Sequence, residues 1–261
     1  MIGEHLPTIG ADRPESGMSR ETEGLIPIYG ISTPRIHTPL NDLPSRGHEL
    51  IDLAASIGVQ LMEWQKFALI HTHKVKADGR WATPINTIVV ARQNGKSFLQ
   101  QIRILGGLFL WDEKLQIGSA HRLATSFEQF REMVNVIESN DSLAKQVKRI
   151  RWAHGAEEVE TIKGTRFIIK AGGSAARGVS RPSTLHLDEL REMSDMDSFA
   201  SLRYTLMAAA NPLVMAYTNA GDSSSIVLNS FRERALAKIA GADDEIGYFE
   251  WSAPTDEISV E

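Results

Sequence analysis

Residues 87–97 read Thr87-Ile88-Val89-Val90-Ala91-Arg92-Gln93-Asn94-Gly95-Lys96-Ser97. A short β-branched run leads into a polar loop, and Gly-Lys-Ser then opens a segment with a helical pattern, Phe98 to Trp111. This layout predicts a phosphate-binding loop, in which backbone N–H groups and a helix N-terminus receive phosphate oxygens. In such a loop Lys96 neutralises the β/γ end and Ser97 reaches Mg²⁺. Gly-Lys-Ser can also occur by chance at a strand–helix junction, so the assignment of a phosphate-binding loop depends on motifs elsewhere in the chain.

The loop departs from the usual G-x-x-x-x-G-K-[ST] pattern at its first glycine position, which is Val90. A β-branched residue takes a positive φ only at a steric cost. We therefore expect the turn to begin one or two residues after Val90.

The composition is that of an ordinary globular protein, with 42% hydrophobic and 23% charged residues over 261 positions. No apolar run approaches the roughly 18 residues that a membrane span needs, and no signal-peptide pattern opens the chain. We expect no membrane association and a cytoplasmic location. The absence of cysteine excludes disulfides, thiolate metal ligands and a cysteine nucleophile.

Charge is unevenly distributed along the chain. The net charge of −5 argues against a protein that binds nucleic acid over its whole surface. Between Ser142 and Arg181, however, nine Lys/Arg face three Glu, and from Gly241 to the end there are seven acidic and no basic residues. The basic region is either the solvated face of a hairpin or a contact with the phosphates of ATP or DNA.

Residues 1–44 hold six of the ten prolines, and we interpret them as an extended or disordered arm. Residues 45–261 then form one domain that begins with two helices, near Ser45–Gly58 and Met62–Lys74, followed by a turn at Ala77–Arg80. Strands alternating with helices predict an α/β fold with a mostly parallel central sheet flanked by helices. We expect strands at 115–119, 183–189, 212–218 and 248–251, a hairpin over 158–170, and helices at 122–139, 198–210 and 224–240.

The strand at 183–189 ends in two carboxylates, Asp188 and Glu189. Ligands of open α/β sheets bind at the carboxyl ends of the strands. Asp188 is placed to hold Mg²⁺, directly or through water, and Glu189 to polarise an attacking water. The alternative is a pair of helix N-cap carboxylates. Because a phosphate loop precedes them, we favour the catalytic interpretation.

Four motifs follow one another in order: Arg92–Ser97, then Ala176-Arg177-Gly178-Val179-Ser180, shortly after it Leu185–Glu189, and then Thr218-Asn219-Ala220-Gly221. This ordered set resembles the ATPase domain of the large terminase subunit of tailed bacteriophages, the motors that package DNA into procapsids. The resemblance covers roughly Glu63 to Trp251. It implies an additional-strand, RecA-like P-loop NTPase that uses ATP and Mg²⁺. It also implies double-stranded DNA, a homo-oligomeric ring, a portal and a small terminase subunit as partners, in the cytoplasm of a bacterial host.

The resemblance also implies roles for single residues. Gln65 resembles the glutamine that contacts adenine, Arg92 the arginine that senses or stabilises the γ-phosphate, and Asn219 with Thr218 the motif that couples hydrolysis to movement. Arg177 is a weaker candidate for a finger that reaches a neighbouring subunit. The loop residues that complete the nucleotide-binding set are Gln93, Asn94, Gly95, Lys96 and Ser97. Ser97 and Asp188 are assigned to the metal. The alternative for Gln65 is an exposed helix glutamine, for Arg92 a plain surface arginine, and for Asn219 a turn-forming asparagine.

The large subunit of this family continues into a nuclease domain, whereas about forty residues follow Asn219 here. We therefore expect ATP hydrolysis without DNA cleavage. Two other functions stay open. One is a helicase-like or other P-loop ATPase, which strand separation would favour. The other is an assembly module that holds nucleotide without turning it over.

Overall fold

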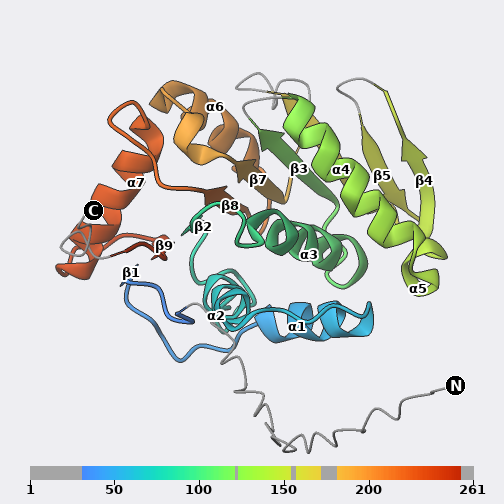
Figure 1. The fold of residues 1–261 in the computed structure, drawn as a ribbon, viewed down its shortest axis with the longest axis horizontal. Helices are drawn as coiled ribbons and strands as arrows, with labels where there is room; N and C mark the ends of the chain where they lie inside the picture. The colour runs from blue at the N-terminus through green and yellow to red at the C-terminus, as the bar shows by residue number, and fades with distance from the viewer. Residues whose placement is uncertain (1–30, 121–122, 154–156, 172–180, 254–261) are drawn as a thin grey trace, which may run out of the picture. The chain divides into compact units, whose positions relative to one another are not determined.

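The computed structural model describes residues 31–120, 123–153, 157–171 and 181–253. These residues form a nine-stranded sheet in the order β1-β9-β2-β8-β7-β3-β6-β5-β4 (Figure 1). Its strands are β1 (Ile36–His37), β2 (Ile85–Val89), β3 (Leu115–Ala120), β4 (Val147–Arg151), β5 (Glu158–Thr161), β6 (Arg166–Ala171), β7 (Thr184–Asp188), β8 (Leu213–Thr218) and β9 (Ile246–Glu250).

The middle of the sheet, from β9 through β2, β8, β7 and β3 to β6, is parallel, and β1, β5 and β4 pair antiparallel at the two edges. Strand β8 lies between β2, which leads into the phosphate loop, and β7, which ends in Asp188. This inserted strand is the arrangement expected of an additional-strand P-loop NTPase. Because neighbouring parallel strands end at the same edge of a sheet, the loop after β2, Asp188 and Asn219 after β8 are brought to one place.

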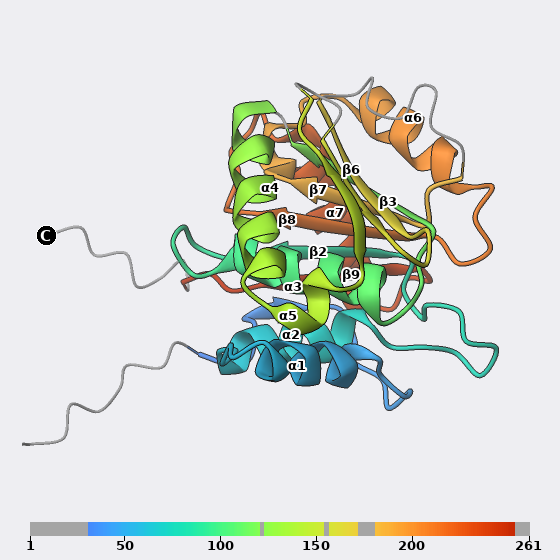
Figure 2. The ribbon, with the colours of Figure 1, turned by 90° about the vertical axis from the view of Figure 1, so that its right-hand side faces the viewer.

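Helices cover both faces of the sheet, as the view in Figure 2 shows, with α4 on one side and α6 on the other. The alternation of side chains along β8 separates the two cores: Leu213, Met215 and Tyr217 face one layer, and Val214 and Ala216 the other. The first layer holds α1 (Gly47–Ser56), α2 (Glu63–Thr72), α3 (Lys96–Phe109), α4 (Leu123–Glu138) and α5 (Asp141–Ala144), and the second holds α6 (Met196–Leu206), α7 (Ile226–Ile239) and a short 3₁₀ turn, η1 (Leu190–Glu192).

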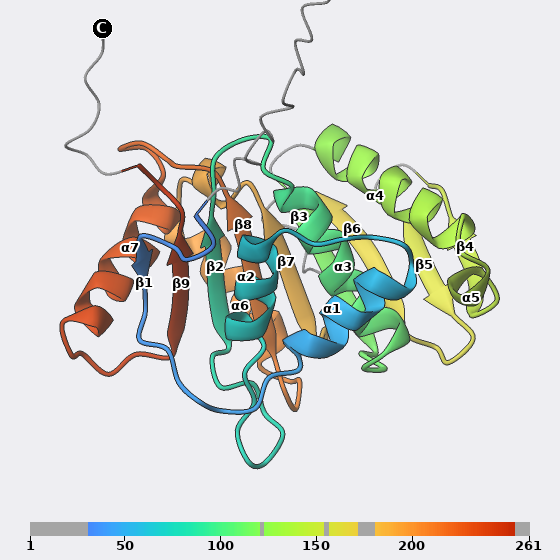
Figure 3. The same cartoon turned by 60° about the horizontal axis from the view of Figure 1, so that its bottom comes forward.

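Helices α1 and α2 pack against each other, and α1 also packs against α3 (Figure 3). The expected stop at Gly58 is confirmed, since its φ of +80° ends α1 in the left-handed region that glycine tolerates. Trp64 of α2 meets Trp251, which follows β9, edge to face at 5.3 Å between ring centroids. This contact places α2 beside the carboxyl ends of β9 and β2, next to the phosphate loop. No helix among the described residues is long and apolar enough to cross a membrane.

The strands and helices expected after the phosphate loop are all present, with ends that differ by a few residues. Two strands were missed. β1 lies in the segment assigned to the arm, and its Ile36 and His37 pair with Glu250 and Phe249, so the sheet begins before Ser45. β4 is a charged edge strand on which three of the five side chains are exposed, so it lacks the alternation of a buried strand. Residues 1–30, the loop at 172–180 with Arg177, and the acidic tail beyond Ala253 lie outside the described residues.

Candidate active site

The phosphate loop connects β2 to α3. Val90 stays buried and its N–H donates to the Thr218 carbonyl of β8 at 3.1 Å, so it continues the sheet. The turn begins at Arg92, and positive φ angles follow at Gln93 (63°) and Gly95 (80°). This confirms that the turn is displaced beyond the missing first glycine. Asn94 braces the loop from within, because its Nδ2 donates to the carbonyls of Ala91 and Arg92 at 3.2 and 3.0 Å.

Gln65 of α2 holds the loop from outside. Its Nε2 donates to the Gly95 carbonyl at 3.1 Å, and its Oε1 accepts from the Met62 N–H at 2.9 Å. The side chain is buried, which contradicts the alternative of an exposed helix glutamine. The φ of +80° at Gly95 favours glycine, and a Cβ there would lie 2.8 Å from Gln65 Nε2, so the Gln65 side chain would have to shift.

Lys96 brings the loop and the strand carboxylates together. Its ammonium donates to Asp188 Oδ1 at 2.9 Å and to Glu189 Oε1 at 2.8 Å. Lys96 and Asp188 are both buried. Two residues ninety-two positions apart thus form a charge pair at the carboxyl edge of the sheet. The pairing of Gly-Lys-Ser with Asp188-Glu189, expected from their order alone, is present in the structure.

Glu189 lies just beyond the end of β7 with a left-handed backbone, φ 52° and ψ 49°. Such a conformation costs energy in a non-glycine residue and is common at functional sites. Although Glu189 occupies the N-cap position of η1, its side chain does not cap the turn but points to Lys96. Burial raises the pKa of this carboxyl, but the hydrogen bond and charge of Lys96, followed by the charge of Arg191, outweigh burial and hold the pKa below its usual value. Glu189 is therefore an ionised carboxylate.

Asn219 follows β8 and is buried beside these carboxylates. Its Nδ2 lies 3.5 Å from Glu189 Oε1, the outer limit of a hydrogen bond. Thr218 Oγ1 accepts from the Arg191 N–H at 3.1 Å and donates to the Asn219 carbonyl at 2.9 Å. The side chains of Thr218 and Asn219 therefore contact the segment after β7 at the Arg191 N–H and at the Glu189 carboxylate.

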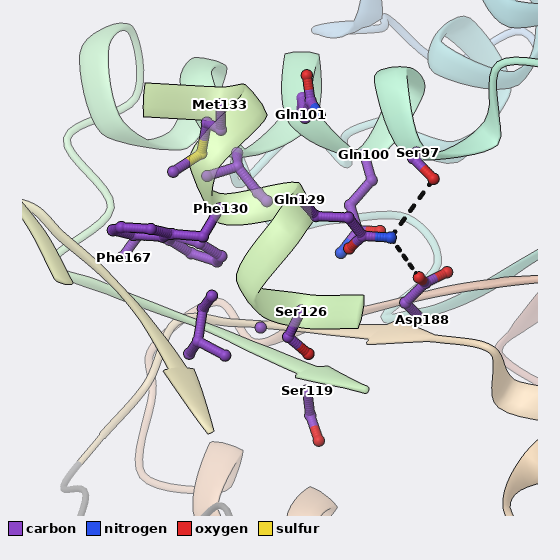
Figure 4. Close-up of a pocket in the computed structure, with 13 residues that line it drawn as sticks. Ser97, Gln100, Gln101, Ser119, Ser126, Gln129, Phe130, Met133, Phe167 and Asp188 are labelled. Carbon is purple, nitrogen blue, oxygen red and sulfur yellow. Dashed lines mark hydrogen bonds between the residues drawn. The ribbon is translucent and has the colours of Figure 1, made fainter. Parts of the chain in front are cut away.

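Ser97 and Asp188 supply the oxygens that the sequence assigns to Mg²⁺. Figure 4 shows them on either side of the Gln129 amide, whose Nε2 lies 3.4 Å from Ser97 Oγ and 2.5 Å from Asp188 Oδ2. A hydroxyl and a carboxylate suit Mg²⁺, which usually binds one or two carboxylates together with phosphate oxygens and waters. Among the described residues no group of three His, Cys, Asp or Glu could hold a metal by itself. The residues present thus fit a metal that takes some of its ligands from the protein and the others from a phosphate substrate and water.

No protein-family model matches the sequence, and no curated protein matches it. Solved structures do. The HK97 bacteriophage large terminase superposes with a TM-score of 0.68 at 18% identity, covering 81% of this chain and 45% of that one. The large terminase ATPase domain of Thermus phage P74-26 superposes with a TM-score of 0.58 at 13% identity, covering 81% of this chain and 87% of that one.

The chain has the fold of a large-terminase ATPase domain. The match spans less than half of the HK97 chain, and identities of 18% and 13% show the fold alone.

Two side chains at this candidate site were missed from the sequence. Arg191 donates from Nε to Glu189 Oε2 at 3.1 Å, and its place two residues after the carboxylate pair was a signal that could have found it. Gln129 reaches the site only because α4 packs over the sheet, and nothing in its local sequence indicates this. Arg92 and Gln93 are exposed, so the structure leaves both a nucleotide role and a plain surface role open for Arg92.

The basic region forms an ion-paired face on β4, β5 and β6. Glu160 of β5 accepts from Lys148 at 2.7 Å and from Arg149 at 2.9 Å. Glu158 is surrounded by three arginines, Arg149, Arg151 and Arg166. Four basic side chains thus share two carboxylates, and the face keeps a net positive charge. This arrangement is compatible with a solvated hairpin face and with phosphate contact.

Proposed function

We propose that this chain is a Mg²⁺-dependent ATPase. The observation that carries the proposal is Lys96 bound to Asp188 and Glu189 where β2 and β7 end, with Asn219 at the end of the strand between them. Phosphoryl transfer requires phosphates to be held, a metal to be placed and a water to be oriented. The loop with Lys96, the pair Ser97 and Asp188, and Glu189 are suited to these three tasks.

Each side chain has a definite part in the proposed reaction. The N–H groups at the start of α3 and the ammonium of Lys96 bind the β- and γ-phosphates. Bound Mg²⁺ would neutralise the developing charge, held by Ser97 Oγ and Asp188. Glu189, ionised and held by Lys96 and Arg191, accepts a hydrogen bond from the attacking water and orients it toward the γ-phosphorus. Asn219 contacts Glu189 and is placed to respond when the γ-phosphate leaves.

We further propose that the hydrolysis drives a DNA-packaging motor of the terminase type. The ordered motifs and the shared fold support this role. The substrate of movement would be double-stranded DNA, and the partners a ring of identical subunits, a portal and a small terminase subunit, in the cytoplasm of a bacterial host. The expectation that this chain does not cleave DNA stays a prediction, and Mg²⁺-dependent cleavage by pure protein that survives Glu189→Gln would contradict it.

The test is phosphate release from ATP by the purified chain, measured across protein concentration and with and without duplex DNA. Glu189→Gln keeps the size of the side chain and removes its charge, so we expect ATP binding to persist and turnover to fall at least about 10²-fold. Turnover that rises with concentration indicates a site completed between subunits. Tight ATP binding without turnover in any condition would favour the assembly module, and unchanged turnover in Glu189→Gln would remove Glu189 from the mechanism.

A further inference from the structure

Gln129 of α4 makes a contact that the proposed reaction does not use. Its amide nitrogen donates one hydrogen to Asp188 Oδ2 at 2.5 Å and lies 3.4 Å from Ser97 Oγ (Figure 4). A glutamine amide carries two N–H donors, so one nitrogen can serve both oxygens. Gln129 thereby joins α4 to the start of α3 and to the end of β7.

The two oxygens that Gln129 contacts are the two assigned to the metal. Mg²⁺ requires its ligand oxygens at about 2.0–2.1 Å in a near-octahedral arrangement, with their lone pairs directed at the ion. Here a lone pair of Asp188 is directed at an N–H, and the amide nitrogen lies between the two groups. A metal held by Ser97 and Asp188 and the amide in this position therefore exclude each other.

The cavity beside Gln129 offers the amide other partners. It has a volume of about 20 Å³, room for about one water molecule, and Gln129, Gln100 and Ser126 all line it. Among the described residues Gln100 Oε1 and Ser126 Oγ are buried without a hydrogen-bond partner. An unsatisfied buried acceptor is costly, so an amide that turns into this cavity would gain a hydrogen bond there.

We propose that Gln129 is a positioning residue that couples metal binding to the position of α4. This inference rests on the proposed function, because it takes Ser97 and Asp188 as the metal ligands. When a metal is bound with nucleotide, the Gln129 amide leaves Ser97 and Asp188 and turns toward Gln100 and Ser126. The contact that ties α4 to β7 is then lost, and α4 moves relative to the sheet.

Trp152, which follows β4, provides a natural reporter of α4. Its ring packs edge to face on Phe127 and Phe130, which flank Gln129 in α4, at 5.7 and 5.1 Å between centroids. Trp152 as a residue is also 47% exposed, so its fluorescence responds to small changes of packing and solvent. The other tryptophans are accounted for by subtracting the signal of a Trp152→Phe variant.

The experiment compares Gln129→Met with Gln101→Met by titrating Mg²⁺ into protein saturated with ADP. Methionine keeps the length of glutamine and removes both donors. Gln101 is the matched control, because it also joins α3 to α4, through Glu132 at 3.1 Å, and lines the same cavity. ADP binding is first measured in EDTA by calorimetry, which tests the nucleotide site apart from the metal.

We expect Gln129→Met to bind Mg²⁺ roughly five- to tenfold more tightly than the parent, because the metal no longer displaces a hydrogen bond to a carboxylate. The parent should show a Trp152 fluorescence change on adding Mg²⁺, and Gln129→Met should start near the metal-bound signal. Gln101→Met should keep the Mg²⁺ affinity of the parent. Gln129→Leu, which also removes both donors and adds no metal ligand, should likewise bind Mg²⁺ more tightly and serves if the methionine variant does not fold.

The same Mg²⁺ affinity and the same Trp152 response in Gln129→Met as in the parent would overturn the inference while leaving the ATPase proposal standing, provided that ADP binds in EDTA. Failure of the parent to bind ADP with or without Mg²⁺ would overturn both.

Discussion

Lys96 balances the charges of the site. Its ammonium contacts both Asp188 and Glu189, and Arg191 provides a second positive charge on Glu189. Arg191 also pairs with Glu192 at 3.0 Å, so Lys96 is the cation that Asp188 and Glu189 share directly. Lys96 has three N–H donors, of which the carboxylates occupy two, so one remains for a phosphate oxygen without breaking either pair.

Gln65 allows a sharp test at the level of a single residue. Gln65→Leu removes the donor to the Gly95 carbonyl and the acceptor for the Met62 N–H. Because these bonds brace the phosphate loop rather than a base, we expect the affinities for ATP and GTP to fall by the same factor, roughly 5- to 30-fold for the loss of one or two hydrogen bonds. Fluorescent nucleotide displacement measures both affinities.

The opposite outcome for Gln65 has a clear meaning. A fall in ATP affinity with GTP affinity preserved would show that the amide contacts adenine, the role implied by the family resemblance. Lys66→Leu, next in the same helix but pairing on the surface with Glu63 at 2.7 Å, is the matched control and should leave both affinities unchanged.

At the level of elements, the sequence predicted the central strands and missed the edges. β7 and β8 are buried along their whole length and bounded by turn residues, which makes them apparent locally. β1 has two residues, and neighbouring Arg35 bonds Glu250 across 215 positions, so local pattern carries no trace of it. The candidate site divides in the same way: Lys96, Asp188, Glu189 and the motif at Asn219 were predicted from their order, whereas Gln129 depends on how α4 packs.

The ion-paired face of β4, β5 and β6 contributes to stability through Glu158. This carboxylate is buried, whereas Glu160 lies nearer the solvent. Glu158→Gln leaves three arginines without their shared partner, and we expect it to lower the free energy of unfolding by about 1–3 kcal/mol, the range for losing hydrogen bonds to a charged group. Glu160→Gln, the control on the same strand, should cost less, since exposed pairs contribute little. Urea titration of both variants measures the difference, and equal losses would show that burial of Glu158 is not what matters.

At the scale of the whole described domain, two fully buried histidines tie stability to pH. Burial, followed by the charge of Arg103, holds the pKa of His73 and of His186 well below the usual range. His186 Nε2 lies 2.9 Å from Gln116 Oε1, and His73 Nδ1 lies 2.9 Å from the Leu69 carbonyl, so each neutral ring has a partner. Arg103 itself pairs with Glu113 at 2.7 Å, so the charge of that carboxylate is already paired. The core therefore favours neutral imidazole at both positions.

The sign of the pH dependence follows from this burial. In the unfolded chain both histidines titrate near their ordinary pKa of about 6.5, whereas in the folded chain they stay neutral well below it. As the pH falls below about 6.5 the unfolded state binds protons that the folded state does not, so stability is lost, by up to about 1.4 kcal/mol per pH unit for each histidine. Urea unfolding at pH 7, 6 and 5 should therefore show a steep decline of the free energy of unfolding before most carboxylates titrate.

The variant His186→Gln should lower the stability at pH 7 but reduce the slope of stability against pH by about one histidine's share. His48→Gln, at an exposed position, should leave the slope unchanged. A flat profile from pH 7 to 5 would mean that the core accommodates charged imidazole, which the position of Arg103 argues against.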